Sequence, residues 1–292
     1  MRYAYYPGCS LHSTAKEYDH SLRAVCERLD IQLAEIKNWF CCGSTPAHSV
    51  SNLLALALPL GNLALVQKMN LTEVIVPCPS CFSRFKSALY KVENERELSQ
   101  KMKAVIGSSL ANGIKVCHPL EIMSSESQLD RIANLKKQEL AGLKVVCYYG
   151  CLLTRPPKVA QFDICEHPET MDRILKAAGV TTLDWSYKTD CCGASFALSK
   201  TDIVLRLSNE ILEAAKAVGA DGIAVACPLC HLNLDARQEE IEATYGVDYN
   251  LPILYFTQLL GLSFGLPPGE LLLRKHFVDA TRKLKEAGLH AR

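Results

Sequence analysis

The chain has 292 residues, of which 49% are hydrophobic and 22% charged, and its formal net charge at pH 7 is +1. These values are typical of a globular protein with a sizeable core, and the length suits two domains. The balanced charge excludes the basic surface of a nucleic-acid-binding protein, and the longest apolar run, residues 53–66, is too short and too broken to span a bilayer.

In the first half of the chain, hydrophobic patterns predict alternating strands and helices. Apolar side chains recur at helical spacing from Ala15 to Leu29, and short apolar runs precede cysteines. The expected elements, in order, are a strand at residues 2–6, a helix at 15–29, a strand at 31–36, a helix over 47–69 with a kink at Pro59, a strand at 74–77 and a helix after it.

The second half repeats this order. Residues 93–138, between the two halves, contain charged helical sequence and a short apolar piece near Val116. We place a boundary near residue 140, which gives domains at 1–140 and 141–292. The expected elements of the second half are strands at 144–149, 180–185 and 223–226, helices at 168–178 and 200–218, a helix after the third strand, and a final amphipathic helix at 269–288.

Alternating strands and helices predict an α/β fold with two pseudo-repeated, Rossmann-like domains, each a mainly parallel sheet flanked by helices. In such sheets, functional groups gather at the carboxyl ends of the strands. Cysteines directly follow the expected strands in both halves. We therefore expect cysteines that are far apart in the sequence to meet at one edge of each domain.

The cysteine pattern itself is repeated. A single cysteine is followed by Cys-Cys-Gly and then by Cys-Pro-x-Cys, and the pattern recurs about 150 residues later. Tyr-Pro-Gly precedes the first copy and Tyr-Tyr-Gly the second. The ten cysteines are Cys9, Cys41, Cys42, Cys78 and Cys81 in the first half, and Cys151, Cys191, Cys192, Cys227 and Cys230 in the second.

The spacing of these cysteines suits a metal centre. In Cys-Pro-x-Cys, the proline favours the first turn of a helix, whose unpaired N–H groups stabilise thiolates. Two intervening residues let both sulfurs face one centre. Adjacent cysteines point to opposite sides of an extended chain, so they share a centre only through a bent backbone or a centre with several metals. Gly43 and Gly193 permit such a bend.

Each half offers five cysteines, whereas a tetrahedral zinc site and an ordinary cubane cluster each take four. Either one cysteine in each half is spare, or each half holds a non-cubane iron–sulfur cluster that uses five. Structural zinc in one or both halves is the main inert alternative, and the adjacent cysteines argue against it. A thiol-only oxidoreductase is a further alternative, but neither Cys-Pro-x-Cys resembles the thioredoxin-type motif.

The other four cysteines have no matched partners in the repeat. Free cysteine behaves as a small hydrophobic residue, so we expect structural thiols at these positions. One falls in an expected helix and another in an expected strand. These four are Cys26, Cys117, Cys147 and Cys165.

The paired pattern resembles the cysteine-rich CCG domain, and two copies over nearly the whole chain are similar to the B-type subunit of heterodisulfide reductase. The resemblance implies two [4Fe-4S] clusters of the non-cubane type, each held by five cysteines. Carried over by position, Cys9, Cys41, Cys42, Cys78 and Cys81 would hold the first cluster, and Cys151, Cys191, Cys192, Cys227 and Cys230 the second.

The resemblance also implies an oxidoreductase that cleaves a disulfide, in methanogens the heterodisulfide of coenzyme M and coenzyme B. The substrate would lie between the clusters and react at cluster iron. Disulfide cleavage takes two electrons, and two one-electron clusters can each supply one. Related CCG proteins serve other substrates, including those of lactate and glycolate oxidation. A non-catalytic electron-relay subunit would carry the same clusters and is the other candidate function.

The absence of two cofactor-binding motifs indicates that this chain needs partner subunits. The chain has no ferredoxin-type cysteine run and no Gly-x-Gly-x-x-Gly after a strand, so we expect no flavin or nicotinamide on it. Electrons would then arrive from other chains, and the resemblance implies a ferredoxin-like subunit, fed by a flavin-containing subunit of the same heterodisulfide reductase-type complex. The N-terminal residues lack the features of a secretory signal, so we expect a cytoplasmic protein, which a partner could attach to a membrane.

No side chain stands out as catalytic. His12 and His231 lie beside cysteine motifs and are weak candidates for proton donors, although a helix-cap or surface role is more ordinary for each. His48 and His118 also lie near these motifs. Three cations could attract an anionic substrate, although solvated surface charge is their more ordinary role: Arg84, Lys86 and Arg155.

Overall fold

The structure is a computed structural model that describes residues 1–44, 46–108 and 113–286. It contains two four-stranded sheets in which every strand pair is parallel. The first sheet has the order β2-β1-β3-β4, with β1 at Arg2–Tyr5, β2 at Gln32–Glu35, β3 at Glu73–Ile75 and β4 at Lys115–Cys117. The second has the order β6-β5-β7-β8, with β5 at Leu140–Tyr148, β6 at Val180–Leu183, β7 at Gly222–Val225 and β8 at Ile253–Tyr255.

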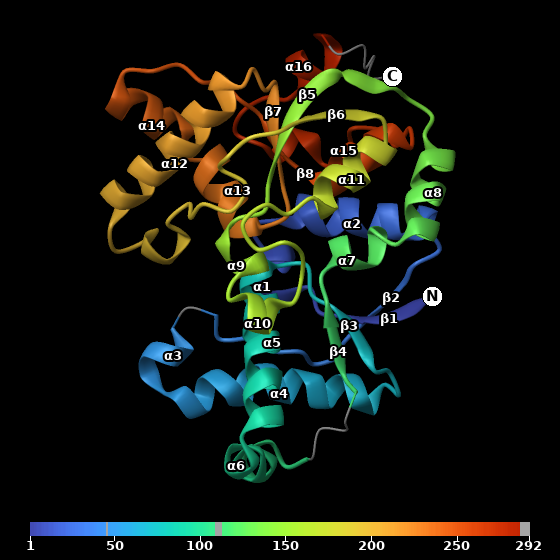
Figure 1. Ribbon diagram of the computed structural model, residues 1–292, viewed down its shortest axis with the longest axis vertical. Helices are drawn as coiled ribbons and strands as arrows, with labels where there is room; N and C mark the ends of the chain where they lie inside the picture. Colours follow the sequence, from blue (N-terminus) through green and yellow to red (C-terminus); the bar gives the residue numbers. More distant parts are fainter. Residues whose placement is uncertain (45, 109–112, 287–292) are drawn as a thin grey trace.

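Helices cover both sheets (Figure 1). Those of the first half are α1 (Gly8–His12), α2 (Lys16–Arg28), α3 (Ala47–Val50), α4 (Asn52–Lys68), α5 (Pro79–Asn94), α6 (Arg96–Ile106), α7 (Pro119–Met123) and α8 (Glu126–Leu135). Those of the second half are α9 (Cys151–Thr154), α10 (Pro157–Ala160), α11 (Thr170–Ala177), α12 (Thr201–Ala217), α13 (Pro228–Asp235), α14 (Gln238–Tyr245), α15 (Phe256–Ser263) and α16 (Thr281–Glu286). Two short 3₁₀ helices are η1 (Ala194–Phe196) and η2 (Leu273–Lys275).

The α/β fold with a duplicated pattern is therefore confirmed. The corresponding strands occupy the same places in the two sheets, since β1 pairs with β2 and β3 as β5 pairs with β6 and β7. In each sheet the chain first crosses over to one neighbour of the first strand, β2 or β6. It then crosses back to the neighbour on the other side, β3 or β7. Binding sites form at the carboxyl ends of strands at such a point. No helix among the described residues is long and apolar enough to span a membrane.

The long helix expected at 47–69 is divided. Ser51 has an extended backbone (φ −160°, ψ 127°) that ends α3, and its side chain accepts a hydrogen bond from Leu54 N–H at the start of α4. A serine at this position stabilises a new helix start. From there α4 continues through Pro59 to Lys68.

The prediction of a final helix at 269–288 is wrong for most of that segment. Residues 269–280 form turns and η2, and only α16 is helical, while residues 287–288 lie outside the described residues. Leu271 and Leu273 are buried in the core, and Leu272 between them has a positive φ of 53°. Burial of apolar side chains has overridden helical periodicity in this segment.

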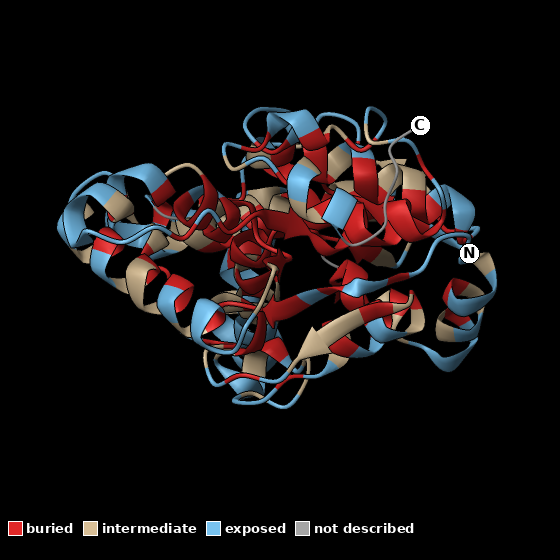
Figure 2. Ribbon diagram, turned by 90° about the horizontal axis from the view of Figure 1, so that it is seen from above, coloured by how far each residue is buried: buried red, intermediate tan, exposed pale blue. Residues whose placement is uncertain are grey.

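The two halves share a buried interface, where red buried segments of both meet in Figure 2. Helix α2 of the first half packs against α15 of the second, and α10 packs against α5. Helices α7 and α8 precede β5 in the chain but pack against α11. The domain boundary near residue 140 stays a prediction, although β5 begins there.

Candidate metal centre

Each Cys-Pro-x-Cys motif lies where a central strand turns into a helix. Cys78 follows β3 and is the N-cap residue of α5, with Pro79 in the first helical turn. Cys227 follows β7 and has the same place before α13, with Pro228 after it. All four cysteines of the two motifs are buried. The motifs therefore hold thiols at helix N-termini, where unpaired N–H groups favour the thiolate.

The Cys-Cys-Gly motifs bend sharply, as their glycines suggested. Gly43 and Gly193 have φ values of 73° and 76°, in the region that favours glycine. Each glycine N–H donates to the sulfur of the first cysteine of its pair, at 3.4 Å for Cys41 and 3.3 Å for Cys191. In both pairs the first cysteine is exposed and the second is buried.

The buried member of each pair lies against the last cysteine of its half. The sulfurs of Cys42 and Cys81 are 3.1 Å apart, and those of Cys192 and Cys230 are 3.5 Å apart. Residues about 40 positions apart in the chain are thus brought together in the same way twice. The expected convergence at the strand ends is present in both halves.

Glycine also precedes the first cysteine of each set. A Cβ atom added to Gly8 would lie 3.3 Å from the sulfur of Cys81, and one added to Gly150 would lie 3.0 Å from that of Cys230. Both glycines have a positive φ, 70° and 68°. Any larger residue would therefore enter the space between the cysteines, so glycine keeps this space open.

Two tyrosines of the repeated motif hold the Cys-Cys-Gly loops. The hydroxyl of Tyr6 donates to the carbonyl oxygen of Phe40 at 2.9 Å, and that of Tyr148 donates to the carbonyl oxygen of Asp190 at 2.7 Å. Each acceptor directly precedes the cysteine pair of its half. The sequence showed that both tyrosines belong to the repeat but gave no role for them, because the contact spans more than 30 residues.

The thiols strongly affect one another's charge. A hydrogen bond from Cys41 lowers the pKa of Cys42 to about 4, and one from Cys151 lowers the pKa of Cys191 to about 6. The pKa of Cys78 lies well below its ordinary value, first because of a hydrogen bond with Cys227 of the other half. The neighbouring thiols and burial shift the pKa values of five other members upward, so charge is unevenly shared within each set: Cys41, Cys81, Cys151, Cys227 and Cys230.

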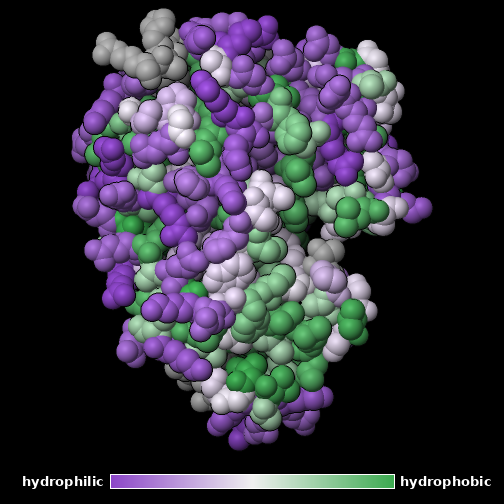
Figure 3. Space-filling view, turned by 180° about the vertical axis from the view of Figure 1, so that it is seen from behind, coloured by the Kyte–Doolittle hydropathy of each residue, from purple (hydrophilic) through white to green (hydrophobic). Residues whose placement is uncertain are grey.

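A cavity with a volume of about 70 Å³ lies among the cysteines of the second set. All five cysteines of this set line it: Cys151, Cys191, Cys192, Cys227 and Cys230. Pro79 and Ser80 from the first half complete its wall. The outline of the molecule narrows at one edge between the two halves in the view from behind (Figure 3).

These features fit an iron–sulfur cluster in each half. The donor atoms are sulfurs, they converge at the strand ends, and glycine leaves room among them. The assignment of all five cysteines of each set to a cluster stays a prediction, and so does the non-cubane type.

Comparison with known proteins agrees with the repeat. The model of the CCG cysteine-rich domain matches residues 3–86 and 145–235. The chain belongs to the CCG cysteine-rich domain family. The two matched ranges contain all ten cysteines of the repeat, which confirms the family expected from the motifs.

Curated relatives of this CCG protein match over nearly its whole length. It is 30% identical to the "8-methylmenaquinol:fumarate reductase membrane anchor subunit" of Wolinella succinogenes, over 96% of this chain and 98% of that protein. It is 26% identical to the B-type subunit of a ferredoxin/F420H2-dependent CoB-CoM heterodisulfide reductase of Methanosarcina acetivorans, over 93% and 92%. A protein of Archaeoglobus profundus, named for its likeness to the same heterodisulfide reductase subunit, is 24% identical over 92% of each.

A solved structure shares the fold. A hypothetical protein from Helicobacter pylori superposes with a TM-score of 0.77 at 12% sequence identity. The match covers 96% of this CCG chain and 52% of the longer Helicobacter chain. At this identity, the likeness concerns the fold alone.

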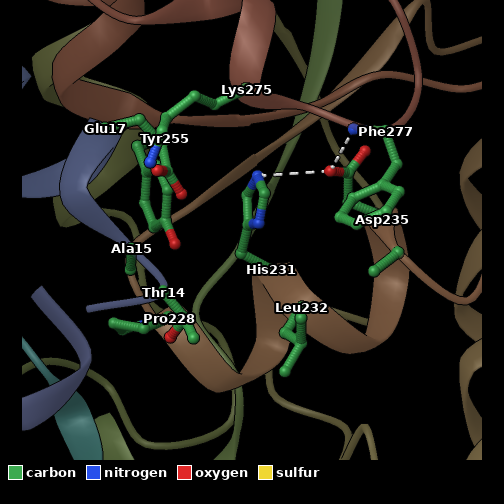
Figure 4. A pocket seen from close by; sticks show the side chains of 11 residues that line it. Thr14, Ala15, Glu17, Pro228, His231, Leu232, Asp235, Tyr255, Lys275 and Phe277 are labelled. Carbon is green, nitrogen blue, oxygen red and sulfur yellow. Dashed lines mark hydrogen bonds and ion pairs between the residues drawn. The ribbon is translucent and has the colours of Figure 1, made fainter.

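The two histidines proposed as proton donors have different surroundings. His12 is half-exposed, and its ring lies edge-on to Trp39 with Nε2 3.2 Å from the carboxylate of Glu35. His231 is buried and stacks on the ring of Tyr255 at 4.6 Å. It lines a polar pocket together with Asp235, Lys275 and other residues (Figure 4). A role for either in proton transfer stays a prediction.

His231, Asp235 and His276 form a cluster that could bind a metal ion, but its histidines also make hydrogen bonds with neighbouring residues. Its donor atoms lie within 4.8 Å of one another, as in a metal site. However, the amide group of Gln258 donates to Nε2 of His276 at 2.8 Å, because its oxygen already accepts from Tyr255 N–H. Nε2 of His231 lies 2.8 Å from Nδ1 of His276 and 3.1 Å from the carbonyl oxygen of Ile253. Burial raises the pKa of Asp235 to about 6 and lowers that of His276 to about 4.

His118 is also buried, and its Nε2–H donates to the carbonyl oxygen of Pro77 at 2.8 Å, directly before Cys78. Burial lowers its pKa to about 4, so the ring is neutral at pH 7. His48 lies in α3 and is exposed. His118 is thus the histidine that supports a cysteine loop.

The unmatched cysteines and the three cations lie outside the two sets. Cys26 is in α2, Cys117 in β4 and Cys147 in β5, all buried, whereas Cys165 is half-buried in a loop. Burial raises the pKa of Cys117 to about 12, which favours a neutral structural thiol. The cations are Lys86, which lies over the ring of Phe82, Arg84, which is half-buried in α5, and Arg155, which pairs with Glu166.

Proposed function

We propose that this chain is the iron–sulfur subunit of a multisubunit oxidoreductase, in which two cysteine-bound clusters act together in a two-electron reduction. The observation that carries the proposal is the meeting of the two cysteine sets, since Pro79 and Ser80, directly after Cys78, line the cavity among the cysteines of the second set. Relatives named as reductase subunits support an oxidoreductase role with iron–sulfur cofactors. Each cluster, when bound, supplies one electron at a time.

The chain's own residues would hold, separate and shield the two centres. Cys9, Cys41, Cys42, Cys78 and Cys81 would bind one [4Fe-4S] cluster, and Cys151, Cys191, Cys192, Cys227 and Cys230 the other, both of the non-cubane type. Six of these ten are buried, which excludes water from the thiolates. Gly8 and Gly150 leave the space that the clusters need.

A disulfide is the substrate class that we propose first. Cleavage of its S–S bond consumes two electrons and two protons and gives two thiols. Relatives named as the B-type subunit of CoB-CoM heterodisulfide reductase support this reading. By the same likeness, a ferredoxin-like subunit would supply the electrons, and a flavin-containing subunit would reduce that subunit. If the complex attaches to a membrane, it would lie on the cytoplasmic side.

A quinol-linked relay is the second candidate. The relative from Wolinella succinogenes, 30% identical over nearly the whole of both chains, is named for 8-methylmenaquinol and fumarate. In this role the chain would pass electrons between a quinone and a partner enzyme without reducing a disulfide.

Thiol release separates the two candidates. We would reconstitute the chain anaerobically, supply electrons from reduced methyl viologen, and titrate the thiols formed from small disulfides. Disulfide reductase activity predicts two thiols for two dye molecules oxidised, and loss of activity in Cys42→Ala and Cys192→Ala. A fully loaded chain that reduces quinones but releases no thiol from any disulfide supports the relay instead.

A further inference from the structure

A polar hollow opens between the two halves of the chain, and we call it the inner hollow. It has a volume of about 40 Å³, and its lining includes Glu17 of the first half and His231, Asp235 and Tyr255 of the second. Figure 4 shows Glu17 and Tyr255 on one side of His231 and Phe277 on the other. All ten cysteines of the repeat are among the described residues and none of them lines this hollow, so it is not the space of a cluster.

Two buried oxygen atoms of residues in this lining have no hydrogen-bond partner within the described part of the chain. They are Oε2 of Glu17, a residue that is 4% exposed, and the hydroxyl of Tyr255, which is fully buried. Buried polar atoms are ordinarily satisfied. These two atoms therefore indicate that a ligand with hydrogen-bond donors enters the inner hollow.

The charge of Glu17 narrows the choice of ligand. Its carboxylate makes no ion pair within residues 1–44, 46–108 and 113–286. Burial raises the pKa of this carboxyl, and the charge of Lys275, an exposed residue of the lining, offsets the effect only in part. A buried carboxylate is stable when a cation pairs with it. The inner hollow therefore favours a cationic group that carries N–H donors.

A larger outer hollow adjoins the inner one. It has a volume of about 390 Å³ and shares Asp235, Ala236 and Phe277 with the inner hollow. Lys275 is the only lysine or arginine among the described residues that line either hollow. The carboxylates that line the two hollows are Glu17, Asp235, Glu239, Glu242, Asp248 and Asp279.

Two cations beside the outer hollow are hydrogen-bonded to the backbone. The guanidinium of Arg237 donates to the carbonyl oxygen of Ala197 at 2.9 Å. The ammonium group of Lys216 donates to the carbonyl oxygen of Asp248. Neither group lines a hollow, so carboxylates dominate the surface that a ligand would meet. Such a surface attracts positive charge.

An exposed aromatic ring belongs to both hollows. Phe277 is 74% exposed, and Leu232 in the lining of the inner hollow is 41% exposed. The N–H groups of Phe277 and Val278 donate to the carboxylate of Asp235 at 2.9 and 3.1 Å, which fixes the backbone that carries the ring. Protein interfaces are enriched in aromatic residues and arginine. An ordered phenylalanine among carboxylates therefore suits a contact with a protein segment that carries arginine.

We propose that the two hollows form a docking surface for a basic segment of a partner protein, whose arginine side chain enters the inner hollow and pairs with Glu17. A guanidinium has five N–H donors on one planar cation, so a single arginine can donate to Glu17 and to the hydroxyl of Tyr255. Further basic residues of the segment would face the outer hollow, and its apolar residues would contact Phe277. The inference goes beyond the proposed function, because it concerns a protein contact and does not depend on the reaction.

Two peptides that differ only in charge test the inference on the anaerobically purified full-length chain. The probe is acetyl-Arg-Leu-Arg-Leu-Arg-amide. The control peptide has citrulline, the uncharged isostere of arginine, in place of each arginine. Calorimetric titration measures binding without turnover. We expect the arginine peptide to bind at least about tenfold more tightly than the citrulline peptide, and this ratio should fall as the salt concentration rises.

Three variants locate the binding on this surface. Glu17→Gln keeps the shape of the side chain but removes its charge, and it should weaken binding of the arginine peptide about tenfold. Glu93→Gln, at an exposed position on α5 outside both hollows, is the matched control and should change binding less than about twofold. Phe277→Ser, at an exposed position where folding is not at risk, should weaken binding about threefold through lost apolar contact.

Several outcomes would overturn the inference. They are equal binding of the two peptides, unchanged binding in Glu17→Gln, and no binding at about 1 mM peptide. Spermidine that binds as tightly as the arginine peptide, with the same dependence on Glu17, would show a polyamine site instead. Self-association that Glu17→Gln weakens would show that a second copy of the chain covers the surface. Each of these results leaves thiol release and the proposed function intact, and a chain that releases no thiol leaves the inference intact.

Discussion

Individual glycines decide whether the cysteines can surround a cluster. Gly150 has a positive φ and no room for a side chain, because a Cβ would lie 3.0 Å from the sulfur of Cys230. Gly219 has a positive φ of 76° as well, but a Cβ there would meet nothing within 4 Å. A comparison of Gly150 with Gly219 therefore distinguishes the effect of backbone strain from the effect of crowding among the cysteines.

Substitution by alanine tests this difference. Gly150→Ala and Gly219→Ala should each lower the free energy of unfolding by about 1 kcal/mol through backbone strain. Gly150→Ala alone should also lower the iron bound per chain and alter the visible spectrum of the second cluster. Equal iron content in the two variants and the wild type would show that Gly150 does not serve the metal centre.

His118 should make stability depend on pH. Its pKa falls from 6.5 in the unfolded chain to about 4 in the folded one, so the folded state binds fewer protons between these values. Stability is then fully present above pH 6.5 and is lost as the pH falls toward 4, by about 3 kcal/mol in total.

The variant His118→Gln can keep a donor for the carbonyl oxygen of Pro77 but cannot titrate. Denaturant unfolding of wild type and variant from about pH 5 to about pH 7.5 should give a stability difference that narrows or reverses as the pH falls. Parallel curves for the two proteins over this range would contradict the buried, neutral state of the ring.

At the scale of elements, α2 and α15 join the two halves through a buried hydrogen bond. The hydroxyls of Ser21 and Thr257 are 2.7 Å apart, and both residues are fully buried. The hydroxyl of Ser21 also donates to the carbonyl oxygen of Glu17 at 2.7 Å, so Thr257 is the donor to Ser21. Removing Ser21 leaves the hydroxyl of Thr257 unsatisfied, which costs about 1–3 kcal/mol, whereas removing both costs less than the sum.

A double-mutant cycle with Ser21→Ala and Thr257→Val measures this coupling. We expect denaturant unfolding to give an interaction free energy of about 1 kcal/mol. Additive effects, within about 0.3 kcal/mol, would mean that the bond does not stabilise the contact between the halves.

Elements with strong local patterns could be predicted from the sequence, and those fixed by tertiary contacts could not. The strands that end at cysteines were found because short apolar runs precede each motif. The expected helix at 269–288 failed because Leu271 and Leu273 are buried in the core by turns rather than by a helix. Strand β8, Ile253–Tyr255, was missed, since it is short and, unlike the equally short β3, no cysteine motif follows it.

The same distinction holds for the metal centre. The ten cysteines follow from the repeat alone, and the structure brings the sulfurs of Cys42 and Cys81 to 3.1 Å. The contact of Cys78 with Cys227 and the bond between Ser44 and Ser80 depend on how separate loops and halves dock. No local pattern in the sequence encodes such contacts.

At the scale of the whole molecule, the repeat gives two similar cysteine sets that lie close together but are not identical in their surroundings. Ser44 and Ser80 of the first half correspond to Ala194 and Leu229 of the second. Hydrogen bonds and solvent exposure set the reduction potentials of iron–sulfur clusters. The two centres should therefore differ in potential, which gives electrons a preferred direction across the interface between the halves.

The central claim is that each cysteine set binds its own iron–sulfur cluster. Iron and acid-labile sulfide should be measured per chain in the anaerobically purified wild type, in Cys42→Ala, in Cys192→Ala and in the double variant, with Cys26→Ala as a control outside both sets. We predict two four-iron clusters in the wild type and the control, one in each single variant and none in the double variant. Zinc without sulfide, or a full cluster content in either single variant, would contradict the account.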